Sequence, residues 1–227
     1  MRHGVGNGRR GLALAVVLTG MLTGLVTGCA TGSGAGSADG AEGEAGRSAA
    51  AEVARRGASV GAAGSACELP VTFDVAESWK PKAVDAGAEV DGVSEDLAEL
   101  ADAFLRQGPV TMACEIDAKP AGNIGFLRVW TGEPGDADAR AVLEDFVAAE
   151  EGAARERYGT FEAGDVTGTE VEYVTPGDGS ETKTAHALAV VTPDGPVVLH
   201  LGGLDDEEHE EMLPAYELAK TTLHTTA

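Results

Sequence analysis

The chain has 227 residues and is strongly acidic, with 38 Asp and Glu against 16 Lys and Arg and a formal net charge of −22. Such a charge repels the phosphate backbone, so the composition excludes nucleic acid as a partner. It also disfavours close contact with anionic lipid, and it keeps a folded domain soluble.

The first 28 residues are typical of a secretory signal peptide. Arg2, Arg9 and Arg10 form a basic start, and an uncharged, mostly apolar run follows from residue 11 to residue 26. That run is short and is interrupted by glycine and threonine, so it is a poor membrane-spanning helix. The Arg9-Arg10 pair suggests a twin-arginine export signal, but the residues after it match that signal poorly. The preferred interpretation is that the pair supplies the ordinary basic charge of a signal peptide.

The signal ends in Val26-Thr27-Gly28-Cys29. This order of an aliphatic residue, two small residues and a cysteine resembles the lipobox of bacterial lipoproteins. The resemblance implies that the Cys29 thiol receives a diacylglyceryl group, and that the chain is cut just before it and held on the outer face of the cytoplasmic membrane. Two acyl chains, such as palmitate, give stable anchoring. An ordinary signal peptide and an uncleaved anchor are the alternatives.

Residues 30–66 are dominated by Gly, Ala and Ser and contain no aromatic residue. Such a segment buries too little apolar area to offset the entropy lost on ordering. We therefore expect residues 29–66, the lipidated cysteine included, to form a flexible tether. Residues 67–227 then form a single domain that is long enough to build a hydrophobic core.

Two cysteines remain in that domain, Cys67 and Cys114. Because the compartment is oxidising, the number is even and neither cysteine belongs to a CxxC pair, we expect them to form a disulfide. Closing a loop of this length stabilises the fold by about 4 kcal/mol in the chain-entropy view. A catalytic thiol and a buried free pair are the alternatives.

The domain is expected to begin with a strand at residues 71–75, where apolar and polar residues alternate. Trp79 follows a short turn, and Pro81 limits any second strand there to a sheet edge. The clearest helix is predicted at residues 94–107, where apolar residues recur along one face and Ser94 is a suitable N-cap.

The middle of the domain is expected to contain two strands and a helix. Residues 110–116 and 124–130 read as strands, with a turn between them. Asp136 is expected to cap a helix that runs to about residue 158 and becomes polar after Gly152. The apolar positions of this helix include Val142, Leu143, Phe146 and Val147.

Three further strands are predicted at residues 169–174, 183–191 and 197–201. Short turns rich in glycine and proline join them, which indicates two consecutive hairpins. A final helix is expected from about residue 206 to residue 224. Its inward-facing residues are Leu213, Tyr216 and Leu223. Pro214 requires either a late start, with the proline in the first turn, or a kink.

These elements predict an α+β fold, with an antiparallel sheet flanked by about three helices. Phe73-Asp74-Val75 followed by Trp79, the meander from Thr169 to Leu201, and the amphipathic C-terminal helix resemble actinobacterial lipoproteins of the LpqN type. Those proteins are described as similar in fold to the photosystem protein PsbP. The resemblance implies a non-enzymatic binding or accessory domain, and it supplies no catalytic residues.

The run from Asp205 to Glu211 contains six carboxylates and His209. A cation site is one interpretation. However, neighbouring side chains fan out around a helix axis, the spacing of a Ca²⁺ loop is missing, and acidic residues favour a helix N-terminus. We therefore expect a solvated helix start and predict no metal site.

Two histidines and two tryptophans are the remaining candidates. His186 and His200 lie on neighbouring strands of one predicted hairpin, offset in register. Half a metal site or a pH-sensitive pair is possible there, but surface or singly bonded histidines are the expectation. Trp79 and Trp130 are expected to anchor the core, unless one is exposed beside an apolar cleft and marks a binding surface.

The sequence contains no nucleophile elbow, phosphate loop, HExxH motif or paired zinc ligands, so we predict neither an enzyme nor a cofactor. The expected function is that of a membrane-anchored, extracytoplasmic binding or accessory module. Its partners are the bilayer, through acylated Cys29, and either an envelope protein or a small apolar ligand. The alternatives are an envelope hydrolase that uses acidic residues and a passive surface lipoprotein.

Overall fold

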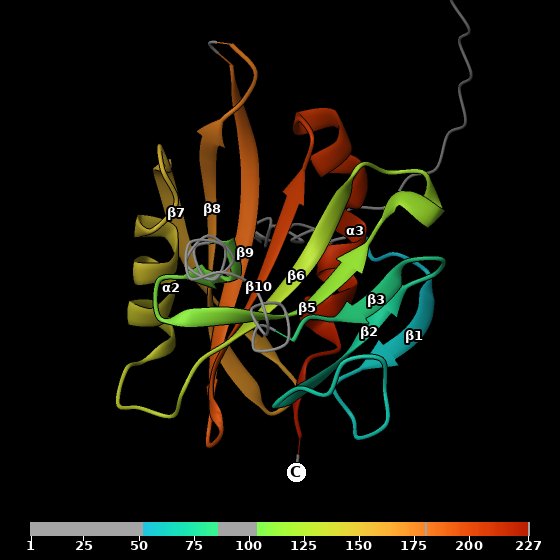
Figure 1. Ribbon diagram of the computed structural model, residues 1–227, viewed down its shortest axis with the longest axis vertical. Helices are drawn as coiled ribbons and strands as arrows, with labels where there is room; N and C mark the ends of the chain where they lie inside the picture. Colours follow the sequence, from blue (N-terminus) through green and yellow to red (C-terminus); the bar gives the residue numbers. More distant parts are fainter. Residues whose placement is uncertain (1–51, 86–103, 180, 227) are drawn as a thin grey trace, which may run out of the picture. The chain divides into compact units, whose positions relative to one another are not determined.

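The computed structural model describes residues 52–85, 104–179 and 181–226, all of which belong to the compact unit Ser48–Ala227. This part of the chain forms two antiparallel sheets and two complete α-helices (Figure 1). The expected signal peptide, Cys29 and most of the expected tether lie outside the described residues. Within these residues, no helix is long and apolar enough to cross a membrane.

The large sheet carries the α+β architecture that the sequence predicts. Its strands are β3 (Lys80–Ala83), β5 (Val110–Asp117), β6 (Gly125–Thr131), β10 (Gly195–Gly203), β9 (Thr182–Thr192), β8 (Val166–Pro176) and β7 (Ala154–Ala163), in that spatial order. The short β4 (Arg106–Gln107) also pairs with β5. Strands β8, β9 and β10 form the two predicted hairpins, and β3, which contains Pro81, is an edge strand as expected.

One face of the large sheet packs against α3 (Asp206–Thr221) and a small sheet. The small sheet has the order β1 (Arg56–Val60), β2 (Val71–Ala76) and β11 (His224–Thr225). The core between these layers buries large apolar side chains, among them Phe73, Leu127, Leu199, Met212 and Tyr216. A disulfide between Cys67 and Cys114 ties the chain before β2 to β5, which confirms the expected pairing.

The other face of the large sheet packs against α2 (Ala139–Ala148), which contacts β8, β9 and β10. The four apolar positions predicted for this helix are buried, and they face Trp130 and Tyr173 in a second core. Asp138, not Asp136, is the N-cap: its Oδ1 accepts a hydrogen bond from the Ala141 N–H at 2.8 Å.

The expected helix from residue 136 to about residue 158 is therefore too long. It ends at Ala148, and a turn containing Gly152, with φ of +79°, leads into β7. The C-cap is Ala149, so the helix is over before Gly152. Glycine adopts this left-handed conformation at little cost, so Gly152 belongs to the turn into β7 and not to a helix. The charged, alanine-rich residues that follow favour a helix locally, but pairing with β8 satisfies their backbone as an edge strand.

The expected tether ends earlier than residue 66, because residues 56–60 form β1. Val60 pairs with Phe73, and Arg56 binds buried Asp74 with Nε and Oδ2 3.0 Å apart. Gly61 has φ of +102°, and a Cβ there would lie 1.9 Å from the backbone oxygen of Val71. This glycine, which composition alone assigns to a linker, is required by the close approach of two backbones.

Most of the helix predicted at residues 94–107 lies outside the described residues. Its last two positions, Arg106 and Gln107, are not helical: they form β4 and pair with Thr111 and Val110. The domain therefore has two complete helices in its described part, where about three were expected, and more of it is sheet.

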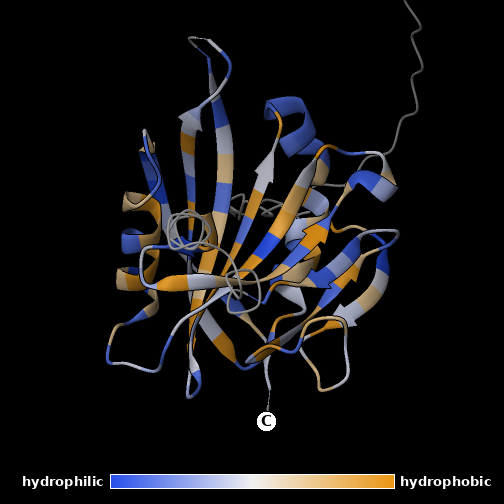
Figure 2. Ribbon diagram, viewed as in Figure 1, coloured by the Kyte–Doolittle hydropathy of each residue, from blue (hydrophilic) through white to orange (hydrophobic). Residues whose placement is uncertain are grey.

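The helix α3 begins at Asp206, so the late start considered for Pro214 is wrong and the proline lies inside the helix. Its acidic first turns are hydrophilic in Figure 2, whereas Met212, Tyr216 and Ala219 are buried. The helix ends at Thr221, earlier than expected, because His224 and Thr225 pair with β2. Leu223 is buried as predicted, just after the helix.

Candidate ligand-binding pocket

Two adjoining hollows lie on the face of the large sheet that α2 partly covers. The lysine hollow, of about 340 Å³, is lined by residues that include Lys119, Phe126, Thr175, Lys183 and Gly202. The tryptophan hollow, of about 550 Å³, is lined by residues that include Val84, Phe104, Leu105, Met112 and Trp130. Arg128, Glu150 and His200 line both. Each volume is in the range typical of small-molecule sites.

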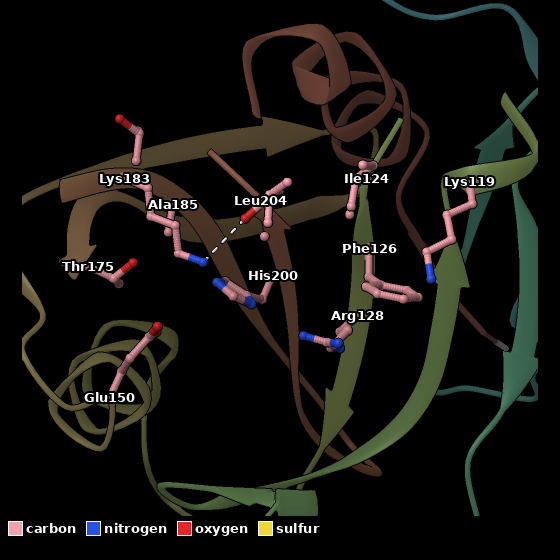
Figure 3. Close-up of a pocket in the computed structure, with 14 residues that line it drawn as sticks. Lys119, Ile124, Phe126, Arg128, Glu150, Thr175, Lys183, Ala185, His200 and Leu204 are labelled. Atoms are coloured by element: carbon pink, nitrogen blue, oxygen red, sulfur yellow. Dashed lines mark hydrogen bonds between the residues drawn. The ribbon is translucent and has the colours of Figure 1, made fainter. Parts of the chain in front are cut away.

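Strand alternation explains why these side chains meet. Phe126, Arg128 and Trp130 are two residues apart on β6, so all three lie on the same face of the sheet. On β10, His200 pairs with Arg128 and Gly202 pairs with Phe126, which places them on that face as well. The side chains of Lys183, His200 and Arg128 point into one space (Figure 3).

His200 lies at the junction of the two hollows and is 9% exposed. Its ring stacks on Tyr173 with centroids 6.3 Å apart and tilts against Phe146 at 5.7 Å. Burial, reinforced by the positive charge of Arg128, lowers the pKa of His200 to about 3. The imidazole is therefore neutral at physiological pH and serves as a hydrogen-bonding group rather than a cation.

Three buried polar atoms around the hollows have no hydrogen-bond partner among the described residues: Trp130 Nε1, Thr175 Oγ1 and His200 Nε2. Trp130 and Thr175 are 4% and 3% exposed. Buried polar groups are nearly always satisfied, because leaving one without a partner costs about 1 to 3 kcal/mol. Each of the three residues lines one or both of the hollows, so a ligand or water bound in the pocket lies next to them.

The charged groups of the lysine hollow are unevenly paired. Arg128 Nε binds Glu115 Oε2 at 2.9 Å, and Glu150 Oε2 accepts a hydrogen bond from the Tyr173 hydroxyl at 2.7 Å. Burial and the neighbouring Glu150 raise the pKa of Tyr173, so its hydroxyl stays protonated and remains a donor.

The two lysines have different contacts. Lys119 Nζ lies 5.5 Å from the centre of the Phe126 ring, and Lys183 Nζ donates to the backbone oxygen of Gly203 at 3.3 Å (Figure 3). Within the described part of the chain, neither lysine forms an ion pair.

The histidine pair considered from the sequence does not form. His186 pairs with Leu201, and His200 pairs with Ala187, so the offset of one residue places the two rings on opposite faces of the sheet. His186 instead meets His209 of α3: His186 Nδ1 and His209 Nε2 are 2.7 Å apart, and the rings stack with centroids 4.9 Å apart.

The acidic helix start is only partly solvated, because His209 within it is 1% exposed. Two of its carboxylates form structural hydrogen bonds. Asp205 caps α3 by accepting a hydrogen bond from the Glu208 N–H at 2.9 Å, and Glu208 accepts a hydrogen bond from the Ile124 N–H at 2.8 Å. Among the described residues, no group of three or more His, Cys, Asp or Glu side chains is placed to hold a metal ion.

Both tryptophans are buried, as expected. Trp79 belongs to the core beneath α3, whereas Trp130 also borders the tryptophan hollow. The roles of Lys119, Arg128 and Lys183 were not anticipated. A signal for one of them was present: the alternation over residues 124–130 places Arg128 between Phe126 and Trp130 on one face.

Comparison with known proteins identifies the family. Residues 37–223 match the family described as "Uncharacterised lipoprotein". The chain belongs to this lipoprotein family. Membership confirms the lipoprotein assignment and indicates a membrane-anchored protein of the cell envelope. No curated protein matches the chain.

This lipoprotein is also similar to a solved structure, that of cyanobacterial PsbP from Synechocystis sp. PCC 6803. The two share 13% sequence identity at a TM-score of 0.44, over 69% of this chain and 87% of the other. A likeness at this level is too distant to support an argument about function.

Proposed function

We propose that this lipoprotein is displayed on the outer face of the cytoplasmic membrane, anchored through Cys29, and that its domain binds a small ligand without transforming it. The binding site is formed by the lysine hollow and the tryptophan hollow. The LpqN-type relationship suggested by the lipobox, the meander and the C-terminal helix is part of this proposal.

The observation that carries the proposal is the set of three unpartnered polar atoms around the pocket. Trp130 Nε1 is a donor only, whereas Thr175 Oγ1 and a neutral His200 Nε2 either donate or accept. Groups of this kind, set among apolar walls, orient a ligand by hydrogen bonds. They are poorly arranged for nucleophilic catalysis, since the Thr175 hydroxyl has no base in hydrogen-bond contact among the described residues.

Native mass spectrometry of the lipoprotein purified from the membranes of the cells that produce it tests the proposal. The blocking variant is Gly202→Leu. A Cβ at Gly202 meets only the His200 ring, at 3.4 Å, so the backbone accommodates the leucine and its side chain enters the lysine hollow. The matched control is Gly159→Leu on β7, where a Cβ meets only the Glu170 side chain at 3.6 Å, outside both hollows.

We expect wild type and Gly159→Leu to carry a non-covalent adduct of non-protein mass, and Gly202→Leu to lose it while keeping its circular dichroism spectrum. An adduct retained by folded Gly202→Leu, or absent from all three proteins, contradicts the proposal. The second result favours a passive surface protein or one that binds another protein.

A further inference from the structure

We propose that the joined hollows bind a monoanionic amphiphile, with its acidic group next to Lys183 and His200, Lys119 at the rim of the same hollow, and its apolar chain along the tryptophan hollow. This inference rests on the proposed function and adds the chemical class of the ligand.

The first argument is the local charge. The protein has a net charge of −22, yet the lysine hollow gathers Lys119, Arg128 and Lys183 against one carboxylate, Glu150. Arg128 is neutralised by Glu115. Lys119 and Lys183 form no ion pair among the described residues, and Lys183 also borders a second hollow lined by Asp205, Asp206 and Glu207. One acidic group on a ligand gives the lysines a partner, whereas the acidic surroundings disfavour a dianion.

The second argument is the position of the cationic and polar groups. In Figure 3, Lys183 and Arg128 point into the space beside His200, whereas Lys119 lies on the far side of the Phe126 ring. An acidic group next to Lys183 therefore lies beside the imidazole, and Lys119 adds positive charge at the rim of the hollow. Hydrogen bonds from lysine to an anionic oxygen are charge-assisted, and they are stronger when partly shielded from water. The neutral His200 adds a directional contact without adding charge.

The third argument is the composition of the neighbouring hollow. Val84, Leu105, Met112 and Trp130 form its apolar part, beside the polar Gln107, Glu115 and Glu150, and Phe104 at its edge is 71% exposed. Exposed large apolar groups beside a concave site are typical of a surface that a ligand covers. Because this hollow adjoins the lysine hollow at Arg128 and His200, one molecule with a charged end and an apolar chain fills both.

The test uses the chain from residue 29 with Cys29→Ser, which contains the whole compact unit Ser48–Ala227 and needs no detergent. The probes are dodecanoate, dodecanol and inorganic phosphate, each titrated by calorimetry, with dodecanoate below its micelle concentration and dodecanol below its solubility limit. We expect one dodecanoate per chain, with dodecanol at least about tenfold weaker and phosphate weaker still, because each lacks one of the two recognised parts.

The variant Lys119→Gln/Lys183→Gln removes both unpaired cations. We expect it to weaken dodecanoate at least about tenfold and to abolish the advantage of dodecanoate over dodecanol. The matched control, Lys80→Gln/Lys82→Gln, makes the same charge change at exposed positions on β3 that line neither hollow, and leaves dodecanoate affinity unchanged. Dodecanoyl lysophosphatidylglycerol, titrated in parallel, separates the two sources of such a ligand: tighter binding than dodecanoate assigns the site to a lipid headgroup, and weaker binding assigns it to a free carboxylate.

Equal affinity for dodecanoate and dodecanol, phosphate binding as tight as dodecanoate, or no effect of Lys119→Gln/Lys183→Gln overturns the inference. It also falls if neither anionic amphiphile binds. If the Gly202-sensitive adduct is nevertheless present on the native lipoprotein, the pocket is a binding site for another class of ligand, and only the ligand class proposed here is wrong.

Discussion

Thr175 and Thr192 are both buried on neighbouring strands of the large sheet, but their hydroxyl groups differ. Thr192 Oγ1 donates to the Gly195 oxygen at 2.9 Å and accepts from the Asp194 N–H at 3.2 Å. Thr175 Oγ1 has no partner among the described residues. Valine has the same shape as threonine without the hydroxyl, so Thr→Val measures what each hydroxyl contributes.

We expect Thr175→Val to raise the free energy of unfolding of the ligand-free protein by about 1 kcal/mol, because it removes an unsatisfied buried hydroxyl. Thr192→Val is the control and is expected to lower it by about 1 kcal/mol. Urea unfolding followed by circular dichroism measures both. If the two substitutions change stability in the same direction, the Thr175 hydroxyl has a partner and the argument for an empty hydrogen-bonding position fails.

At the scale of elements, the pairing of His186 on β9 with His209 on α3 joins a helix to the sheet. One neutral imidazole donates to the other across 2.7 Å. Burial lowers the pKa of both histidines and brings that of His209 to about 4. The charged groups that face the pair are Glu170, Glu172, Lys183, Asp206, Glu217 and Lys220.

The direction of the pH dependence follows from these shifts. An unfolded histidine has a pKa of about 6.5, so the unfolded chain binds the proton first as the pH falls. The stabilisation from neutral His209 is complete above about pH 6.5 and is lost as the pH falls toward about 4, at a cost of up to about 3 kcal/mol.

We expect His209→Phe to reduce the dependence of stability on pH between about 6.5 and 4, measured by urea unfolding at several pH values, while His186 and His200 keep part of that dependence. Tyr216→Phe keeps both imidazoles in place and is the control, with the slope of wild type. If the free energy of unfolding of His209→Phe depends on pH as steeply as that of wild type, the pKa of His209 is not lowered in the folded state.

The disulfide acts at the same scale, since Cys67 precedes β2 of the small sheet and Cys114 belongs to β5 of the large one. Both cysteines are buried, at 1% and 0% exposed. We expect Cys67→Ala/Cys114→Ala to lower the free energy of unfolding by about 2 to 5 kcal/mol, because the unfolded chain regains the freedom of a 47-residue separation. Equal stability of this variant and the oxidised wild type, in the same urea titration, rules out that contribution.

At the scale of the whole molecule, the net charge of −22 leaves the domain without attraction to anionic lipid. Membrane attachment should therefore depend on the lipid at Cys29. We expect Cys29→Ser to move the protein from the membrane fraction to the salt-washed supernatant, whereas wild type stays with the membrane at high salt. A Cys29→Ser protein that sediments with membranes after the same wash contradicts anchoring through this residue.

The sequence by itself determined the elements whose signals are local. The alternation of apolar and polar residues identified β2, β5, β6 and the two hairpins. In a half-buried strand, successive side chains point alternately toward the core and toward solvent. Two cysteines in an oxidising compartment identified the disulfide. The charged start, the apolar run and the lipobox before Cys29 indicated a lipoprotein, which the family match confirms.

Only the tertiary structure decided the features that depend on pairing between distant segments. Residues 56–60 and 154–163 carry weak strand signals, and partner strands override their local preferences for coil and helix. The register of β9 against β10 separates His186 from His200 and gives each a different neighbour. The pocket likewise exists because β6, β9 and β10 place Arg128, Lys183 and His200, up to 72 positions apart in sequence, on one face of one sheet. Side-chain direction follows from the sequence of each strand, but which side chains meet is set by sheet order and register, and these are properties of the whole fold.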